Sequence, residues 1–183
     1  MKIDSLSFLL EQIKHCLNNN EIPAAFYMAL TLPDVCGMLE FPDLKTSDRY
    51  ISWFEKHIGQ YEQSPLAKKD PSWAEMPYMS GENMYKIRNA LLHAGTNDIG
   101  YQFDLNDFLF IWDGAYETGG IETKADGKQI KYWHVNVKIL TQKLVWCVEE
   151  FIKRGNYDKS KLPVLNEYGF DDIPDVFKIN IIK

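Results

Sequence analysis

Cysteine, positive charge and long apolar runs are all scarce in this chain of 183 residues. It has only three cysteines, Cys16, Cys36 and Cys147, and their odd number and wide spacing are not those of a disulfide framework or a zinc site. Its 20 Lys and Arg are outnumbered by 26 Asp and Glu, giving a net charge of −6. Such a charge does not favour nonspecific binding of nucleic acid, so any nucleic-acid site must be local.

The N-terminal region lacks a hydrophobic run of useful length. Its first run is Phe8-Leu9-Leu10, which Glu11 interrupts and which is too short for a signal peptide or a membrane span. Together with the cysteine pattern, this predicts a cytoplasmic protein without a membrane partner. Because His15, His57 and His134 share no ligand spacing with the cysteines, we also expect no metal and no cofactor.

Aromatic side chains, by contrast, are abundant. Ten Phe, ten Tyr and five Trp make up 14% of the chain, and they supply large areas for burial. A hydrophobic content of 45% is enough for one core in a chain of this length. Because no repeat, low-complexity tract or linker composition divides the sequence, we predict a single domain over residues 1–183.

Helical periodicity predicts most of this domain. Stripes of apolar residues three and four apart recur in five places, separated by residues that cap or break helices. The last and longest stripe ends at Gly155, and residues 64–77, with three prolines, are predicted to form a loop. The five predicted helices begin at or near Ser5, Asn20, Ser47, Ser80 and Val137.

A different pattern separates the fourth and fifth predicted helices. The dense apolar run at 108–112 suits a buried strand, and Asp126-Gly127 is typical of a hairpin turn. The predicted fold class is therefore mainly α, a bundle of four to five helices with an inserted β-hairpin or small antiparallel sheet. The bundle covers about residues 5–95 and 137–154, the insertion about 105–136, and an outer C-terminal tail 155–183.

The candidate functional residues are Arg88, Asn89 and His93, near the end of the helix that Gly95 is predicted to terminate. Arginine matches a phosphate bidentately, and the dipole at a helix C-terminus favours a protonated histidine suited to acid or base chemistry. Asn89 could hold His93 in one tautomer or bind a ribose hydroxyl. Five α-helical steps place Arg88 and His93 about 140° apart, so they converge only if a second surface closes over them.

Arg88-Asn89 followed by His93 resembles the signature of the HEPN superfamily, an Arg, usually with a polar residue after it, and a His four to six residues later. The resemblance covers roughly residues 20–95 and 137–154 and includes the segments 32–40, 50–54 and 85–93, which look like a bacterial HEPN-like subgroup. It implies a helical bundle that forms a homodimer, in which two copies of the motif face each other across a shared cleft.

The resemblance also implies a function. Many HEPN proteins are metal-independent endoribonucleases of toxin–antitoxin, abortive-infection or other defence systems, so RNA and an antitoxin or other protein are the expected partners. His93 would take a proton from a ribose 2′-OH or protonate the leaving oxygen, while Arg88 would stabilise the negative charge that builds on the phosphorane. Toxins paired with a nucleotidyltransferase antitoxin carry a Tyr two residues after the His, but here that residue is Gly95, so inactivation through such a Tyr is not expected.

Acidic residues leave other interpretations open. Asp34 and Glu40 could support the site by orienting Arg88 or His93. Alternatively, the chain is a non-catalytic HEPN-like module that binds a protein or a nucleotide, with Arg88 paired to Asp34, Glu40 or Glu82 and His93 capping the helix. A third interpretation makes Asp34 and Glu40 paired catalytic carboxylates.

Overall fold

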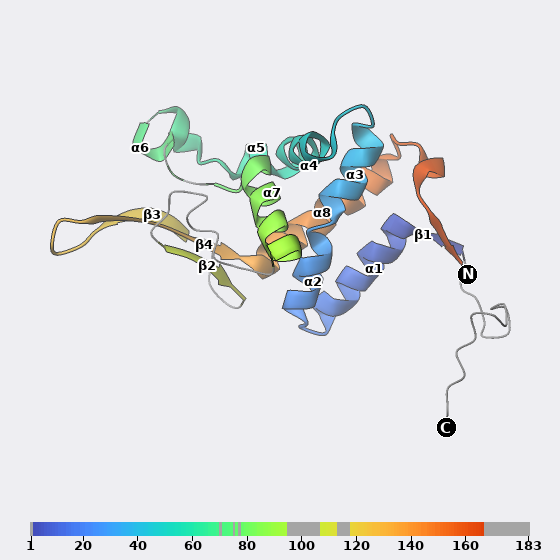
Figure 1. The fold of residues 1–183 in the computed structure, drawn as a ribbon, viewed down its shortest axis with the longest axis horizontal. Coiled ribbons are helices and arrows are strands. Elements are labelled where there is room, and N and C mark those ends of the chain that lie inside the picture. The colour runs from blue at the N-terminus through green and yellow to red at the C-terminus, as the bar shows by residue number, and fades with distance from the viewer. Residues whose placement is uncertain are drawn as a thin grey trace, which may run out of the picture.

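The computed structural model describes residues 2–69, 71–74, 76, 78–94, 107–112 and 118–166. Figure 1 shows the helices gathered into a bundle, from which a three-stranded sheet projects on the side opposite the N-terminus. The fold is mainly helical, with a small sheet after the motif helix, which confirms the predicted fold class.

The first two helices meet at a turn built on Asn20. α1 (Ser5–Asn18) begins where the Asp4 carboxylate accepts a hydrogen bond from the backbone N–H of Ser7 at 2.8 Å. Asn20 has a φ of 59°, a left-handed conformation that Asn tolerates at the end of a helix. The residue at the N-cap of α2 (Ile22–Ala29) is Glu21, so the prediction that Asn20 caps this helix is wrong.

α3 (Leu32–Glu40) and α4 (Thr46–Phe54) pack so closely that only glycine fits at one contact. A Cβ atom at Gly37 would lie 2.6 Å from the backbone oxygen of Arg49. α4 begins at Thr46, just before the predicted cap Ser47, and continues through the π-helical turn η1 (Glu55–Gly59) into α5 (Gln60–Glu62).

The segment Ile22–Glu40 is long and apolar enough, by length and composition alone, to cross a membrane. In this fold it consists of α2 and α3, and 56% of its most apolar window is buried inside the protein. Its apolar residues are explained by packing, since Ala25, Phe26 and Leu32 are fully buried in the core.

The region predicted as a loop before the motif helix contains two short helical turns, η2 (Pro65–Lys68) and α6 (Pro71–Ala74), and each begins with a proline. The motif helix α7 (Gly81–Asn89) begins where predicted, and the Ser80 hydroxyl caps it by accepting a hydrogen bond from the backbone of Asn83 at 3.2 Å. α7 widens into a second π-helical turn, η3 (Ala90–Ala94). Its predicted end, Gly95, lies outside the described residues.

The sheet consists of β2 (Asp107–Ile111), β3 (Thr118–Thr123) and β4 (Gln129–Asn136), with β4 in the centre. β3 and β4 form the predicted antiparallel hairpin, whose turn contains Gly127 at a φ of 80°. β2 pairs with β4 in parallel, so the sheet is mixed and not antiparallel. The central strand β4 therefore separates β2 from β3, its neighbour in sequence.

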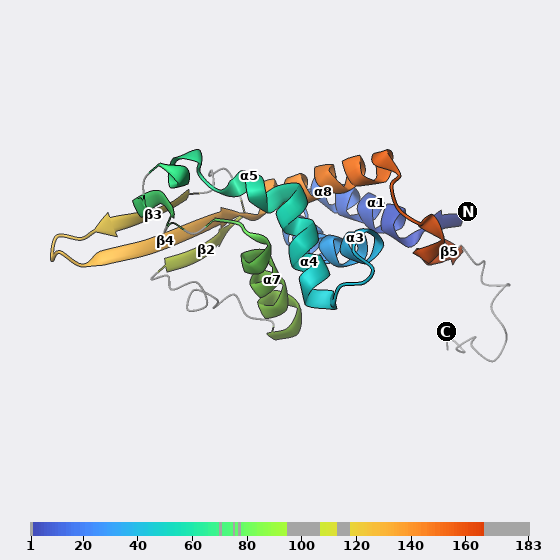
Figure 2. The ribbon, with the colours of Figure 1, turned by 90° about the horizontal axis from the view of Figure 1, so that it is seen from above.

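β4 leads directly into α8 (Val137–Arg154), and the two elements follow the long axis of the molecule (Figure 2). The Asn136 side chain caps α8 by accepting from the backbone of Ile139 at 3.0 Å, and Gly155 ends it with a φ of 67°, as predicted. Beyond η5 (Lys159–Lys161), the strand β5 (Val164–Asn166) pairs with β1 (Lys2–Asp4), which the sequence did not indicate. Tail residues 167–183 lie outside the described residues.

One hydrophobic cluster extends from α1 through α8 to Leu162. Its largest fully buried side chains include Trp53, Trp133 and Tyr50, so much of the aromatic content serves packing. The rings of Phe26 on α2 and Phe110 on β2 meet edge to face at 5.7 Å, which joins the sheet to the bundle.

We expect Gly37→Ala to lower the free energy of unfolding by about 1–3 kcal/mol, because the added methyl group forces the backbones of α3 and α4 apart. Urea denaturation followed by far-UV circular dichroism measures the change. Gly119→Ala is the control, since its Cβ would meet Trp133 and Tyr132 only at an ordinary contact distance of 3.5 Å. Helix propensity alone would make Gly37→Ala at least as stable as wild type. That result would contradict the close packing of α3 and α4.

Candidate functional site

The motif helix α7 is held against α4 by its buried face. Met84 and Ile87 are fully buried, and a Cβ atom at Gly81 would collide with the backbone oxygen of Ile51. This close approach fixes the position of the helix, so Arg88, next to Ile87, emerges at the edge of the core.

Arg88 forms the centre of a short polar chain between α3 and α7. Its Nη2 lies 2.9 Å from Oδ2 of Asp34, and its Nη1 donates to Oδ1 of Asn89 at 2.9 Å. The ion pair is partly sheltered, with 18% of the Arg88 side chain and 22% of the Asp34 side chain exposed. Among the three acidic partners predicted for Arg88, which are Asp34, Glu40 and Glu82, Asp34 forms the ion pair.

Two tyrosines complete what we call the Arg88 cluster: Asp34, Tyr50, Tyr85, Arg88 and Asn89. Tyr50 is fully buried, donates to the backbone oxygen of Leu30 at 3.1 Å, and packs its ring 5.3 Å from that of Tyr85. Burial and the Asp34 carboxylate raise the pKa of Tyr50 well above its usual value, although Arg88 opposes them. The phenol therefore stays protonated and acts as a donor.

The sequence pattern did not indicate either tyrosine as a residue of the site. Tyr85 precedes Arg88 by three positions, which places the two on neighbouring parts of the helix surface, and this spacing was the available signal. The role of Tyr50 depends on a contact between separate helices, so spacing within one helix could not reveal it.

His93 has its backbone in η3, and its side chain lies outside the described residues. A π-helical turn closes its hydrogen bonds over five residues instead of four. Two residues five positions apart therefore point in more similar directions around the helix axis than they do in a regular α-helix. This widening brings the backbone positions of Arg88 and His93 nearer to a common face than the 140° expected from the sequence.

Glu40 belongs to a different group. Its carboxylate contacts Nε2 of His57 at 2.7 Å and Nζ of Lys56 at 2.5 Å, and both of these residues lie in η1. Six residues along α3 separate Glu40 from Asp34 by about 9 Å of helix axis, and the two bind different partners. The structure does not bring them together as paired carboxylates.

The cysteine thiols are not poised as nucleophiles. Burial raises the pKa of Cys36 well above its usual value and raises the pKa of Cys147 to about 11, so both are protonated near neutral pH. Within the part of the chain that the structure describes, no group of three or more His, Cys, Asp or Glu is arranged to hold a metal ion.

A groove of about 570 Å³ lies between η1, α5 and α8, and neither Arg88 nor Asp34 lines it. Comparison of the chain with protein-family models, with curated proteins and with solved structures found no match. The functional assignment of the Arg88 cluster therefore depends on its geometry and on the Arg-x4-His pattern.

We expect Asp34→Ala to lower the free energy of unfolding by about 1–2 kcal/mol, because Arg88 keeps a partly sheltered charge and loses its carboxylate. A double-mutant cycle with Arg88→Ala isolates the coupling between the two side chains. Asp48→Ala, at an exposed position of α4, is the control. Additive effects of the two single substitutions would show that the ion pair contributes nothing.

A second prediction concerns pH. Burial raises the pKa of Glu40, but the hydrogen bonds and charges of Lys56 and His57 outweigh it and leave the pKa below its ordinary value of 4.5. A carboxylate with a lowered pKa stabilises the fold above that ordinary value, and this contribution is lost as the pH falls through the lowered pKa. Wild type should therefore exceed Glu40→Gln in stability at neutral pH, with the difference shrinking below about pH 4.5.

Urea unfolding between pH 3 and pH 7 tests this pH dependence over roughly the range in which carboxylates titrate. Glu122→Gln on the exposed hairpin controls for the loss of one negative charge. A difference between wild type and Glu40→Gln that stays constant over the whole range would rule out the assigned role of Glu40.

Proposed function

We propose that this chain is a HEPN-type effector that acts on RNA in a bacterial defence, toxin–antitoxin or stress system, as a metal-independent endoribonuclease or as an RNA-binding protein. The observation that carries the proposal is the chain Asp34–Arg88–Asn89, which fixes a guanidinium group beside the π-helical turn that contains His93. In this proposal two copies form a homodimer in the cytoplasm, and Asp34 supports the site.

The geometry of Arg88 suits a phosphate. Asp34 and Asn89 hold two nitrogen atoms of the guanidinium at 2.9 Å each, which restricts the plane of the group. A donor whose orientation is already fixed stabilises developing negative charge with little reorganisation. Arginine also matches two phosphate oxygens at once, which lysine cannot do in the same geometry.

The proposed reaction uses the ribose of the substrate as nucleophile. The 2′-oxygen bonds to the neighbouring phosphorus and the bond to the 5′-oxygen breaks, which leaves a 2′,3′-cyclic phosphate and a 5′-hydroxyl. His93 accepts the 2′-OH proton or donates a proton to the departing 5′-oxygen. Two copies of the motif across a dimer would supply one histidine for each transfer, while Arg88 stabilises the negative charge on the oxygens of the phosphorane.

A second candidate function is favoured by the same ion pair. Asp34 already compensates the charge of Arg88, as expected if the motif is a structural network at the end of a helix. The chain is then a non-catalytic HEPN-like module that binds a protein partner or a nucleotide. The net charge of −6 also suits a protein partner better than a long RNA.

Cleavage of total bacterial RNA in the presence of EDTA tests the first proposal. We expect cleavage by wild type and a loss of about 100-fold or more in Arg88→Lys and His93→Ala, because the first removes the guanidinium fork and the second the proton-transfer group. Arg49→Lys and His15→Ala are the matched controls, and both should retain activity. Circular dichroism and size-exclusion chromatography with light scattering establish folding and dimerisation of each variant.

A folded wild-type dimer that leaves RNA intact would reject the endoribonuclease and favour the binding module. Cleavage that persists in Arg88→Lys and His93→Ala would place any activity outside this motif. A monomeric variant that keeps the motif but no longer cleaves RNA would support a cleft shared by two copies.

A further inference from the structure

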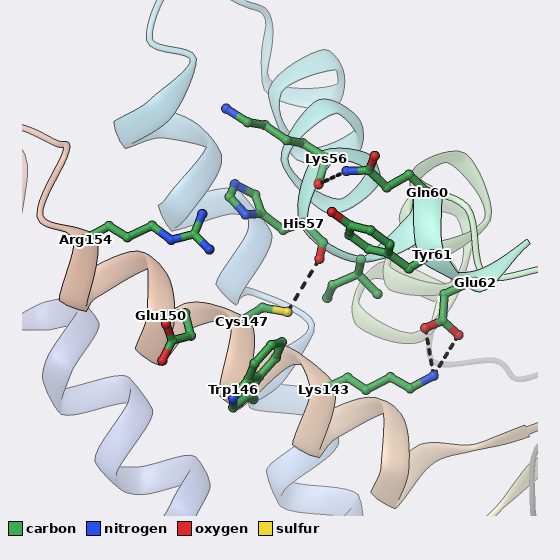
Figure 3. Close-up of a pocket in the computed structure, with 11 residues that line it drawn as sticks. Lys56, His57, Gln60, Tyr61, Glu62, Lys143, Trp146, Cys147, Glu150 and Arg154 are labelled. Carbon is green, nitrogen blue, oxygen red and sulfur yellow. Dashed lines mark hydrogen bonds and ion pairs between the residues drawn. The ribbon is translucent and has the colours of Figure 1, made fainter.

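The groove between η1, α5 and α8 is separate from the Arg88 cluster (Figure 3). One wall is a face of α8 from Lys143 to Arg154, which extends roughly 16 Å along the helix axis. The other wall is formed by η1 and α5. The volume of about 570 Å³ lies within the range of small-molecule sites, roughly 300–1,000 Å³.

Two aromatic rings lie on opposite walls of this groove. Trp146 on α8 is 64% exposed and Tyr61 on α5 is 75% exposed. Within the described ranges neither ring packs against another aromatic ring, and Figure 3 shows both beside the open groove. Because both exposed rings line the same groove, they form two apolar faces between which a planar group can stack.

The positive charges of the groove are not equivalent. Lys143 is neutralised by Glu62, whose two oxygens lie 2.7 and 2.8 Å from its Nζ. Lys56 is neutralised by Glu40 at 2.5 Å.

Arg154 makes no hydrogen bond or ion pair among the residues that the structure describes, and in Figure 3 its guanidinium points from α8 toward the His57 side of the groove. Glu150, one turn earlier on α8, pairs instead with Lys153 at 3.5 Å. The groove therefore offers one cation that is not compensated.

The wall opposite α8 is held in place. Three consecutive residues of η1, Lys56 to Ile58, line the groove, and π-helical turns occur frequently at functional sites. The His57 ring packs 4.7 Å from Trp53 and is fixed by Glu40, while its backbone oxygen accepts from the Cys147 thiol at 3.6 Å. The groove is thus formed before any ligand arrives.

We infer that this groove binds a small molecule that joins a planar ring to one anionic group, with the ring against Trp146 and Tyr61 and the anion at Arg154. A nucleoside 5′-monophosphate and an aromatic carboxylate both have this chemistry. The site is independent of the proposed reaction at Arg88, because neither Arg88 nor Asp34 lines it.

Isothermal titration of the full chain tests this inference with adenosine 5′-monophosphate, adenosine, ribose 5-phosphate and indole-3-acetate. Saturable binding of one ligand per chain is expected for the monophosphate, for indole-3-acetate, or for both. Trp146→Ala should weaken ligand binding at least about tenfold, because the ligand ring loses a stacking partner. Arg154→Gln should weaken binding of the anionic ligands and leave binding of adenosine unchanged.

Trp112→Ala and Arg49→Lys are the matched controls, since neither residue lines the groove, and both should bind as wild type does. Tighter binding of the monophosphate would identify the anion as a phosphate, and tighter binding of indole-3-acetate would identify it as a carboxylate. No saturable binding of either at millimolar concentration would overturn the inference, as would binding that survives both Trp146→Ala and Arg154→Gln. Because Trp146 and Arg154 are exposed, circular dichroism should show both variants folded.

Discussion

The buried Tyr50 side chain is the contact on which the candidate site depends. Its hydroxyl bonds the backbone oxygen of Leu30, where α2 meets α3, and its ring packs against Tyr85 on α7. The phenol thus joins three helices at one point, and the glycines at positions 37 and 81 let the backbones around it approach closely. Asp34 and Arg88 are 54 residues apart in sequence, and they meet because this packing brings α3 and α7 together.

The π-helical turn η1 connects this cluster to the groove. One side of the turn presents Lys56 to Ile58 to the groove. On another side, the Glu55 carboxylate accepts a hydrogen bond from the backbone of Gly81 at 2.9 Å, at the first residue of α7. The same short segment therefore forms a wall of the groove and holds the start of the helix that carries Arg88. An irregular turn suits both tasks, because its extra residue aims neighbouring groups in directions that a regular helix does not offer.

Local chemistry explains which parts of the fold could be predicted from the sequence. Ser80, Gly155 and Asp126-Gly127 act on their immediate neighbours, so they predicted a helix start, a helix end and a hairpin turn. Asn20 was assigned wrongly because asparagine suits both ends of a helix, and only the packing decides between them. The parallel pairing of β2 with β4 and the pairing of β1 with β5 depend on distant partners, as does the groove, and no local pattern encodes them. For the site, the sequence indicated Arg88 and its possible partners. Only the tertiary structure shows that Asp34, and not Glu40, pairs with Arg88.

The ion pair between Asp34 and Arg88 limits how the motif can work. A phosphate that approaches Arg88 meets a guanidinium whose charge a carboxylate 2.9 Å away already compensates, and the net charge of the chain is −6. The attraction of one copy for RNA is therefore weak, although the orientation of Arg88 is well fixed. Under the proposed function, a second copy brings the same ion pair and therefore adds no net positive charge; it contributes a second oriented guanidinium and a second histidine. Dimerisation is then a requirement of proton transfer, and a monomeric variant should lose cleavage.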